Sequence, residues 1–341
     1  MSPLNTTIQR GTVMSILVLG LCSAGPPAIG EGKLAKPGES DLARIVGQPV
    51  PAPFARIEWR TGEPPRIIPF IYAVESPRYD EGFLSNLARA LGVDGKATRM
   101  PTDFLGAPGF WIKESNPTNA LRWKAVFFSQ VSGQIGYASG ADNHRWDLRN
   151  QRPSAIGVPT TEEALQKTLA LLPILGLHRE ELESNADGTI RWDSSNEGTT
   201  YTDRADGQRK RYIRQRNIML WQLVPNGGSM LSMGGGGVFR AGFMSEGALA
   251  EFELLFRKVK PLRPLKPLSR SEILNCLRKG HARTFLDRVP DSICVTNCSL
   301  VYPQGNVEFK QKHLWPFYAV TGWSVEGNST NNLSVYVPLA W

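Results

Sequence analysis

The chain has 341 residues, of which 41% are hydrophobic and 21% are charged, and its formal net charge is +8. This composition excludes an intrinsically disordered chain, and the length excludes a small scaffold that needs disulfides to hold its core. The basic excess suits an acidic partner, such as an anionic polymer, an envelope surface or an acidic protein, and it equally suits plain solubility.

Residues 1–24 have the layout of a secretory signal peptide. Arg10 is the only charged residue before Glu31, and an apolar run over residues 13–21 ends in small residues up to Ala24. The run is about half of the ~20 residues that a membrane-spanning helix needs. We therefore expect a secreted or periplasmic protein, with no transmembrane span once the leader is cleaved. If the leader stays attached, the protein becomes an envelope-bound module.

Residues 25–53 are rich in glycine, proline and lysine, with the proline cluster Pro49-Val50-Pro51-Ala52-Pro53 at the end. Such a composition is typical of a linker that is extended where prolines gather. We therefore expect a Pro/Gly-rich linker between the leader and the folded part.

Three later segments carry helix signals. The first, residues 80–91, places leucines on one stripe. The other two, residues 160–172 and 269–279, each open with a capping box. In a capping box, a serine or threonine and a glutamate three residues later satisfy each other's backbone N–H groups; the pairs here are Thr160 with Glu163 and Ser269 with Glu272.

Between the helices the residues alternate as in antiparallel strands. Residues 121–128 and 134–138 flank the turn Ser132-Gly133, which predicts a hairpin. Residues 209–223 alternate over a long stretch, and residues 315–325 and 333–338 look like a closing hairpin.

The order of these elements predicts an α+β fold, built from two or three repeated helix-plus-antiparallel-sheet units in tandem. We place an N-terminal unit at residues 54–155, a middle unit at 156–262 and a C-terminal unit at 263–341. Spaced prolines at the start of the last unit suggest a seam there.

The densest basic stretch lies at residues 209–216 and includes Arg211, Tyr212, Arg214 and Arg216. Strand alternation would place Arg214 and Arg216 on one face, where guanidinium groups grip carboxylate or phosphate. Export argues against nucleic acid as the partner. We expect either a face for an anionic partner or a solvated face that protects a sheet edge.

Three cysteines remain after the leader: Cys276, Cys294 and Cys298. In an oxidising compartment an odd number favours one disulfide and one spare thiol. Cys294 and Cys298 could close a short loop, and pairing of Cys276 with either of them is the alternative. A zinc site is not expected, because no second close cysteine or histidine pair accompanies them.

No motif predicts a catalytic residue, a cofactor or a metal. The polar neighbours of His144 form no known catalytic pattern, and the glycine tract 234–237 lacks the Lys-Ser/Thr of a phosphate-binding loop. Residues 183–190 partly match a calcium loop, but an Asp187-Gly188 hairpin turn explains them equally well.

The predicted unit, a capped helix followed by a small sheet with a Ser-Gly or Asp-Gly turn, resembles PepSY-type propeptide domains of the inhibitor type. The resemblance extends over residues 67–341. It is carried by the helix openings at 161–165 and 271–274, the turn at 131–135, and the closing strand pair that contains 318–320 and 335–337. It implies a non-catalytic protein that inhibits a protease or regulates a membrane partner, and it transfers no functional residue.

These observations favour an exported, non-enzymatic binding or regulatory protein that uses a sheet surface to bind a protein or a cell-envelope component. One alternative is a secreted hydrolase of polysaccharide or peptide, which requires two carboxylates across a deep cleft. Another is a carbohydrate-binding module, suggested by nine tryptophans; a planar row of exposed tryptophan side chains would favour that function, and burial of the tryptophans would remove it.

Overall fold

The computed structural model describes most of one compact unit, which begins at Pro37. The predicted leader and the first part of the predicted linker lie outside the described residues. The residues that the structure describes are 37–51, 53–75, 79–100, 108–115, 123–140, 146–147, 152–153, 157–202, 206–226, 228–232, 236–286, 290, 292–305, 310–326 and 329–339.

Strands dominate this structure, which is nearly all-β, so the predicted α+β fold of repeated units is wrong. The part described has four α-helices: α1 (Glu39–Val46), α2 (Glu81–Ala90), α4 (Thr161–Leu171) and α5 (Arg270–Arg278). Two short 3-10 helices are at Arg179–Glu181 and Ser245–Gly247.

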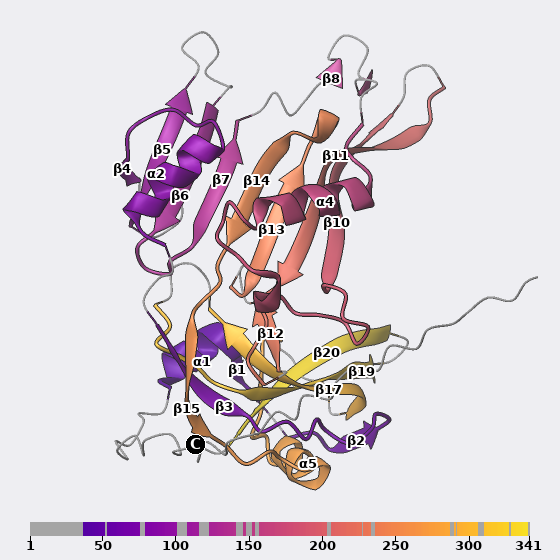
Figure 1. Ribbon diagram of the computed structural model, residues 1–341. Helices are drawn as coiled ribbons and strands as arrows, with labels where there is room; N and C mark the ends of the chain where they lie inside the picture. The colour runs from indigo at the N-terminus through magenta and orange to yellow at the C-terminus, as the bar shows by residue number, and fades with distance from the viewer. Residues whose placement is uncertain are drawn as a thin grey trace, which may run out of the picture. The chain divides into compact units, whose positions relative to one another are not determined.

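The largest sheet has eight antiparallel strands and forms the upper part of Figure 1. Its strands, in spatial order, are β10 (Trp192–Thr202), β11 (Arg209–Trp221), β13 (Val238–Phe243), β14 (Leu249–Leu254), β7 (Ile135–Ser139), β6 (Trp123–Ser129), β5 (Gly109–Ser115) and β4 (Thr98–Met100).

A second sheet has seven strands, and β17 is its hub. In spatial order the strands are β1 (Gln48–Pro49), β16 (Arg283–Thr284), β20 (Ser329–Pro338), β19 (Phe317–Glu326), β17 (Ser292–Gln304) and β12 (Ser229–Ser232), with β2 (Arg56–Trp59) also paired to β17. The pairings of β12 and β2 with β17 are parallel, and the others are antiparallel.

Two smaller sheets complete the structure. The three-stranded sheet consists of β15 (Val259–Pro264), β3 (Phe70–Val74) and β18 (His313–Leu314), with β3 in the middle. The two-stranded sheet pairs β8 (Trp146–Asp147) with β9 (Arg152–Pro153).

Strand pairing crosses the tandem units that the sequence suggested. The eight-stranded sheet joins strands from residues 98–139 to strands from residues 192–254. The early strands β1, β2 and β3 instead pair with β16, β17, β15 and β18, which come from the last third of the chain. The unit is therefore interleaved, because its N-terminal and C-terminal segments build the same sheets.

The three predicted helices are confirmed. The Asp80 side chain accepts a hydrogen bond from the Phe83 N–H at 2.8 Å, and both predicted capping boxes are present at Thr160 and Ser269. The linker prediction needs correction, because α1 forms within it and buries Leu42, Ile45 and Val46. The spacing of these residues follows the helical repeat.

Both predicted hairpins are also present. Strands β6 and β7 pair around a turn in which Gly133 has φ of 76°, and β19 pairs with β20 along its whole length. The long strand β11 matches the alternating stretch that begins at Arg209.

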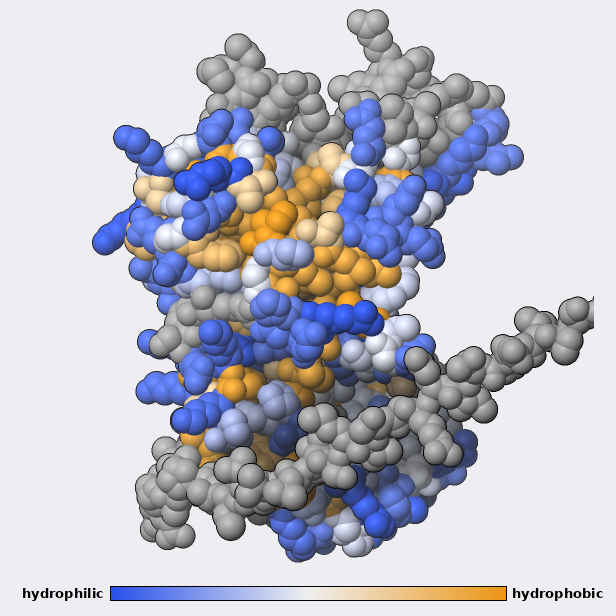
Figure 2. All heavy atoms as spheres, in the orientation of Figure 1, coloured by the Kyte–Doolittle hydropathy of each residue, from blue (hydrophilic) through white to orange (hydrophobic). Residues whose placement is uncertain are grey.

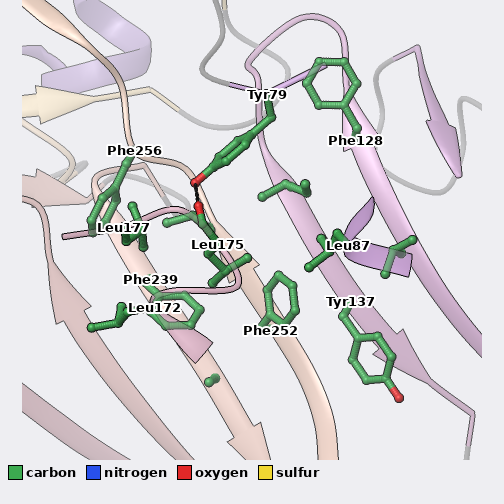
Figure 3. Close-up of a cluster of buried hydrophobic side chains, with 14 of the residues drawn as sticks. Tyr79, Leu87, Phe128, Tyr137, Leu172, Leu175, Leu177, Phe239, Phe252 and Phe256 are labelled. Atoms are coloured by element: carbon green, nitrogen blue, oxygen red, sulfur yellow. Dashed lines mark hydrogen bonds between the residues drawn. The ribbon is translucent and has the colours of Figure 1, made fainter. Parts of the chain in front are cut away.

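Helices α2 and α4 pack on one face of the eight-stranded sheet and build its core (Figure 1). Figure 3 shows this core, where Phe239 and Phe252 make an edge-to-face contact with ring centroids 6.0 Å apart. The Tyr79 hydroxyl donates to the Leu175 carbonyl at 3.0 Å. Figure 2 shows apolar surface gathered on this side of the molecule, between patches of charged side chains.

No helix in the described part of the chain is long and apolar enough to span a membrane.

The capping box of α5 yields a stability prediction. We expect Ser269→Ala to lower the free energy of unfolding by about 1 kcal/mol, because the Glu272 backbone N–H loses its acceptor. Urea denaturation measures the change. Asn275→Ala, at an exposed position of the same helix, is the control and should not destabilise the protein. Equal loss in both variants would contradict the role of the cap.

Candidate functional site: a cleft between two sheets

The face of the eight-stranded sheet opposite α2 and α4 carries polar and charged side chains. Strand alternation places Ile218 and Leu220 of β11 in the helix-covered core, so Asn217 and Met219 belong to the opposite face. Arg240 pairs with Met219 in register, and Glu253 pairs with Arg240, so both lie on this polar face as well.

A cleft of about 790 Å³ separates this polar face from the seven-stranded sheet. Its first wall comes from β11, β13 and β14, its second wall from β17, β19 and β20, and β12 lies at one end. The polar and aromatic residues of the first wall are Arg191, Trp221, Arg240 and Glu253; those of the second wall are Asn297, Ser299, Thr321, Ser334 and Tyr336.

Charges on the first wall are paired with each other. Arg191 donates to Glu183 at 2.7 Å, and its guanidinium stacks over the Trp221 ring at 4.7 Å from the centroid. The Ser229 hydroxyl donates to the same Glu183 oxygen at 3.1 Å. Glu183 therefore anchors both Arg191 and the start of β12 at the edge of the cleft.

Arg240 forms the second charged group of this wall. It donates to Glu251 at 3.1 Å, and its Nη2 lies 3.7 Å from a Glu253 carboxylate oxygen. Burial raises the pKa of Glu253, and the neighbouring Glu251 raises it further, while Arg240 opposes the shift. Gln215 also donates to Glu251, at 2.9 Å, and thereby fixes the far side of this group.

The described residues of the second wall carry no charge, and Val301 and Ala319 line it beside the polar side chains. A β-bulge leaves Thr296 without a pairing partner, so that Val295 pairs with Gly322 and Asn297 with Thr321. After the bulge, Asn297 and Ser299 face the cleft. The wall therefore offers hydroxyl and amide groups to a ligand, opposite paired ions.

The predicted basic face of β11 does not form. A second bulge leaves Arg214 without a pairing partner, because Glu197 pairs with Gln215 and Gly198 with Ile213. Arg214 donates to Glu197 at 3.2 Å on the polar face, whereas Arg216 donates to Thr161 of α4 on the helix-covered face.

The other two residues of the predicted basic face are also placed separately. Tyr212 is buried, and Arg211 is exposed opposite Thr200. Arg214 and Arg216 thus contact different elements, because a bulge reverses the alternation that a regular strand would have.

The possible Cys294–Cys298 disulfide does not form in the structure, where Cys276, Cys294 and Cys298 are free thiols. Residues four apart on a strand are about 13 Å apart, well beyond the reach of a disulfide. The Thr296 bulge moreover places them on opposite faces, because Cys294 pairs with Trp323 and Cys298 with Val320.

The half-buried tryptophans do not form a bare platform. Cations lie over the rings of Trp59, Trp111, Trp123, Trp221 and Trp323, at 4.7–5.5 Å from the ring centroids. Lys113 serves two of these rings, Trp111 and Trp123, which lie on neighbouring strands. These five tryptophans therefore do not form a planar row of free aromatic faces.

The remaining motifs have structural explanations where they are described. In the suspected calcium loop, Asp187 accepts from the Thr189 N–H at 2.9 Å and Gly188 has φ of 79°, as in a tight turn. The described residues contain no cluster of three or more metal-ligating side chains. In the glycine tract, a Cβ at Gly237 would lie 2.2 Å from Met230, so close approach of β12 requires glycine there. His144 lies outside the described residues.

Sequence reasoning missed the cleft. A usable signal was present in β14, where Glu251 and Glu253 alternate with Phe252 and Leu254. Such alternation indicates a strand with one apolar and one charged face. The alternation of β14 does not reveal that Arg240 of β13 pairs with those carboxylates.

Comparison with known proteins adds little to this geometry. No protein-family model matches the chain, and no curated protein matches it. A solved structure of an uncharacterized protein from Eubacterium rectale is similar, with 6% sequence identity over 82% of this chain and 85% of the other, at a TM-score of 0.39. Similarity at that level supports no inference about function.

The raised pKa of Glu253 predicts a pH dependence of stability. Because the folded state binds the proton more tightly than the unfolded state, stability falls as pH rises from the ordinary value of 4.5 through the folded pKa. We expect Glu253→Gln to remove this decline, so that the variant gains stability relative to wild type between pH 4 and pH 7. Urea denaturation across that range measures it. The exposed Glu63→Gln is the control, and an identical profile for both variants would contradict the prediction.

The free thiols yield a chemical prediction. After denaturation without reductant, we expect an alkylating reagent to modify Cys276, Cys294 and Cys298 completely, as measured by peptide mass mapping. In the folded protein Cys276 should react first, because it is only partly buried, whereas burial raises the pKa of Cys298 to about 12. Recovery of a cross-linked Cys294–Cys298 peptide would refute the assignment.

Proposed function

We propose that this protein is an exported, non-enzymatic binding protein that holds an uncharged, polar segment of a cell-envelope glycan in the cleft between its two large sheets. One observation carries the proposal: ions that are already paired on one wall face hydroxyl and amide groups on the other wall. Such a surface offers many hydrogen bonds and little free charge, which suits the hydroxyl groups of a neutral sugar chain.

The size of the cleft supports this assignment. Its volume of about 790 Å³ lies within the ~300–1,000 Å³ typical of ligand-binding sites. Tyr336 lies on one wall and Trp221 on the other, so aromatic rings are also present to contact the apolar faces of sugar rings. Because Arg191 covers part of Trp221, hydrogen bonding rather than stacking dominates the recognition we propose.

The arrangement of carboxylates supports binding over hydrolysis. Glu251 and Glu253 lie on the same strand and share Arg240, instead of lying on opposite sides of the cleft. Hydrolysis of a glycosidic bond needs a pair of carboxyl groups, one on each side of that bond. The described residues of the second wall supply hydroxyl and amide groups but no carboxylate.

A second candidate is a protein partner that adds a strand to β10. This strand has eleven residues and forms an edge of the eight-stranded sheet, with β11 as its neighbour. Its described side chains are mostly exposed, and an edge strand presents unpaired backbone groups to an incoming strand.

A filled cleft should weaken glycan binding. We expect wild-type protein to bind a neutral hexasaccharide of glucose or of N-acetylglucosamine by calorimetry. Ser334→Trp places a large ring in the cleft from an exposed position, so binding should weaken at least tenfold. The control is Asn331→Trp, which changes an exposed position on the same strand outside the cleft lining.

Three outcomes would contradict the proposal. The first is that wild-type protein binds neither sugar, and the second is that Ser334→Trp binds as tightly as wild type. The third is release of reducing ends by wild type that Glu253→Gln abolishes, which would assign a hydrolase. Capture of an envelope protein that survives Ser334→Trp would favour the edge of β10 instead.

A further inference from the structure

A second, smaller cavity lies where segments from four parts of the chain meet, and it is separate from the cleft. Its volume is about 210 Å³. The turn between β6 and β7 forms one side, and Arg257 after β14 forms another. Residues 310–312 before β18 form a third side, and residues 74–75 at the end of β3 form the fourth. Among the described residues that line it, three side chains are cationic, Arg257, Lys310 and Lys312, and one is a carboxylate, Glu75.

Arg257 is only 5% exposed and is held in place by several hydrogen bonds. Its backbone N–H donates to Gln222 Oε1 at 3.0 Å, and its carbonyl accepts from Gln222 Nε2 at 2.6 Å. Its guanidinium donates to Gln311 Oε1, which also accepts from the Gly305 N–H at 3.0 Å. A guanidinium fixed in this way is preorganised for an anion.

Burial of the Arg257 guanidinium disfavours its charged form, which affects its pKa. Burial lowers the pKa of Arg257 to about 10, which still leaves the side chain charged at neutral pH. An anion in the cavity would be attracted to this guanidinium more strongly than in bulk water, because opposite charges attract more strongly away from water.

Lys310 and Lys312 complete the cationic lining from the rim. Both are exposed, and they flank the buried Gln311 that contacts Arg257. Lysine ammonium groups on flexible stems adapt to an anion, whereas the arginine provides fixed, directional donors. The polar turn that includes Ser132 and Gly133 forms the opposite side of the cavity.

We propose that this cavity binds a small oxyanion of the phosphate type, with Arg257 at its base and Lys310 and Lys312 at its mouth. The volume is below the ~300 Å³ at which sites for drug-sized ligands begin, so we expect one anionic group with few further atoms. The same chemistry is shared by free phosphate and by a phosphoryl group on a larger envelope molecule.

Calorimetry of the full chain at low ionic strength tests the site, with inorganic phosphate and glycerol 3-phosphate as separate probes. We expect binding of at least one probe, and a loss of tenfold or more in the double variant Lys310→Gln/Lys312→Gln. The matched control is Lys260→Gln/Lys279→Gln, which removes the same charge from exposed positions outside the cavity lining and should change affinity less than twofold.

The two probes distinguish the source of the anion. Similar affinities would assign free phosphate, and clearly tighter binding of the ester would assign a phosphoryl group on a larger molecule. Arg257→Gln, checked for folding by circular dichroism, should abolish binding of both. No binding of either probe by wild type, or equal losses in the two double variants, would overturn the proposal. Neither result bears on glycan binding in the cleft, which Ser334→Trp tests separately.

Discussion

A buried cluster of polar side chains joins the sheets, and the positions of both proposed sites depend on it. Gln222 follows β11, Arg257 follows β14, Gln304 ends β17 and Gln311 precedes β18. Gln222 binds both backbone groups of Arg257 and also accepts from Gln304 Nε2 at 3.2 Å. Because buried polar groups are costly unless they are paired, such a network restricts the sheets to arrangements that satisfy it.

A second connection between the sheets is β12, which follows β11 of the eight-stranded sheet in the chain and pairs in parallel with β17. The two connections lie beside different cavities. Pairing of β12 closes one end of the cleft, and the contact of Arg257 with Gln311 forms the base of the smaller cavity. Ligand binding at either site would thus act on groups that already link separate sheets.

Charge is distributed unequally between the two sites, and this difference separates their proposed ligands. In the cleft, Arg191 and Arg240 each have a carboxylate within 3.1 Å, so the net field offered to a ligand is small. In the smaller cavity, the described lining residues include three cations and one carboxylate. We therefore assign hydrogen-bonding recognition to the first site and anion recognition to the second.

The sequence by itself determined the local elements. Capping boxes at Thr160 and Ser269, and the turn at Gly133, act within a few residues, so their helices and hairpin were predictable. Tertiary structure decided which strands pair and which way their side chains point. Bulges at Arg214 and Thr296 reverse the alternation on β11 and β17, and they depend on partner strands that are distant in sequence. The cleft between the sheets and the separated arginines follow from those bulges and long-range pairings, which no local pattern specifies.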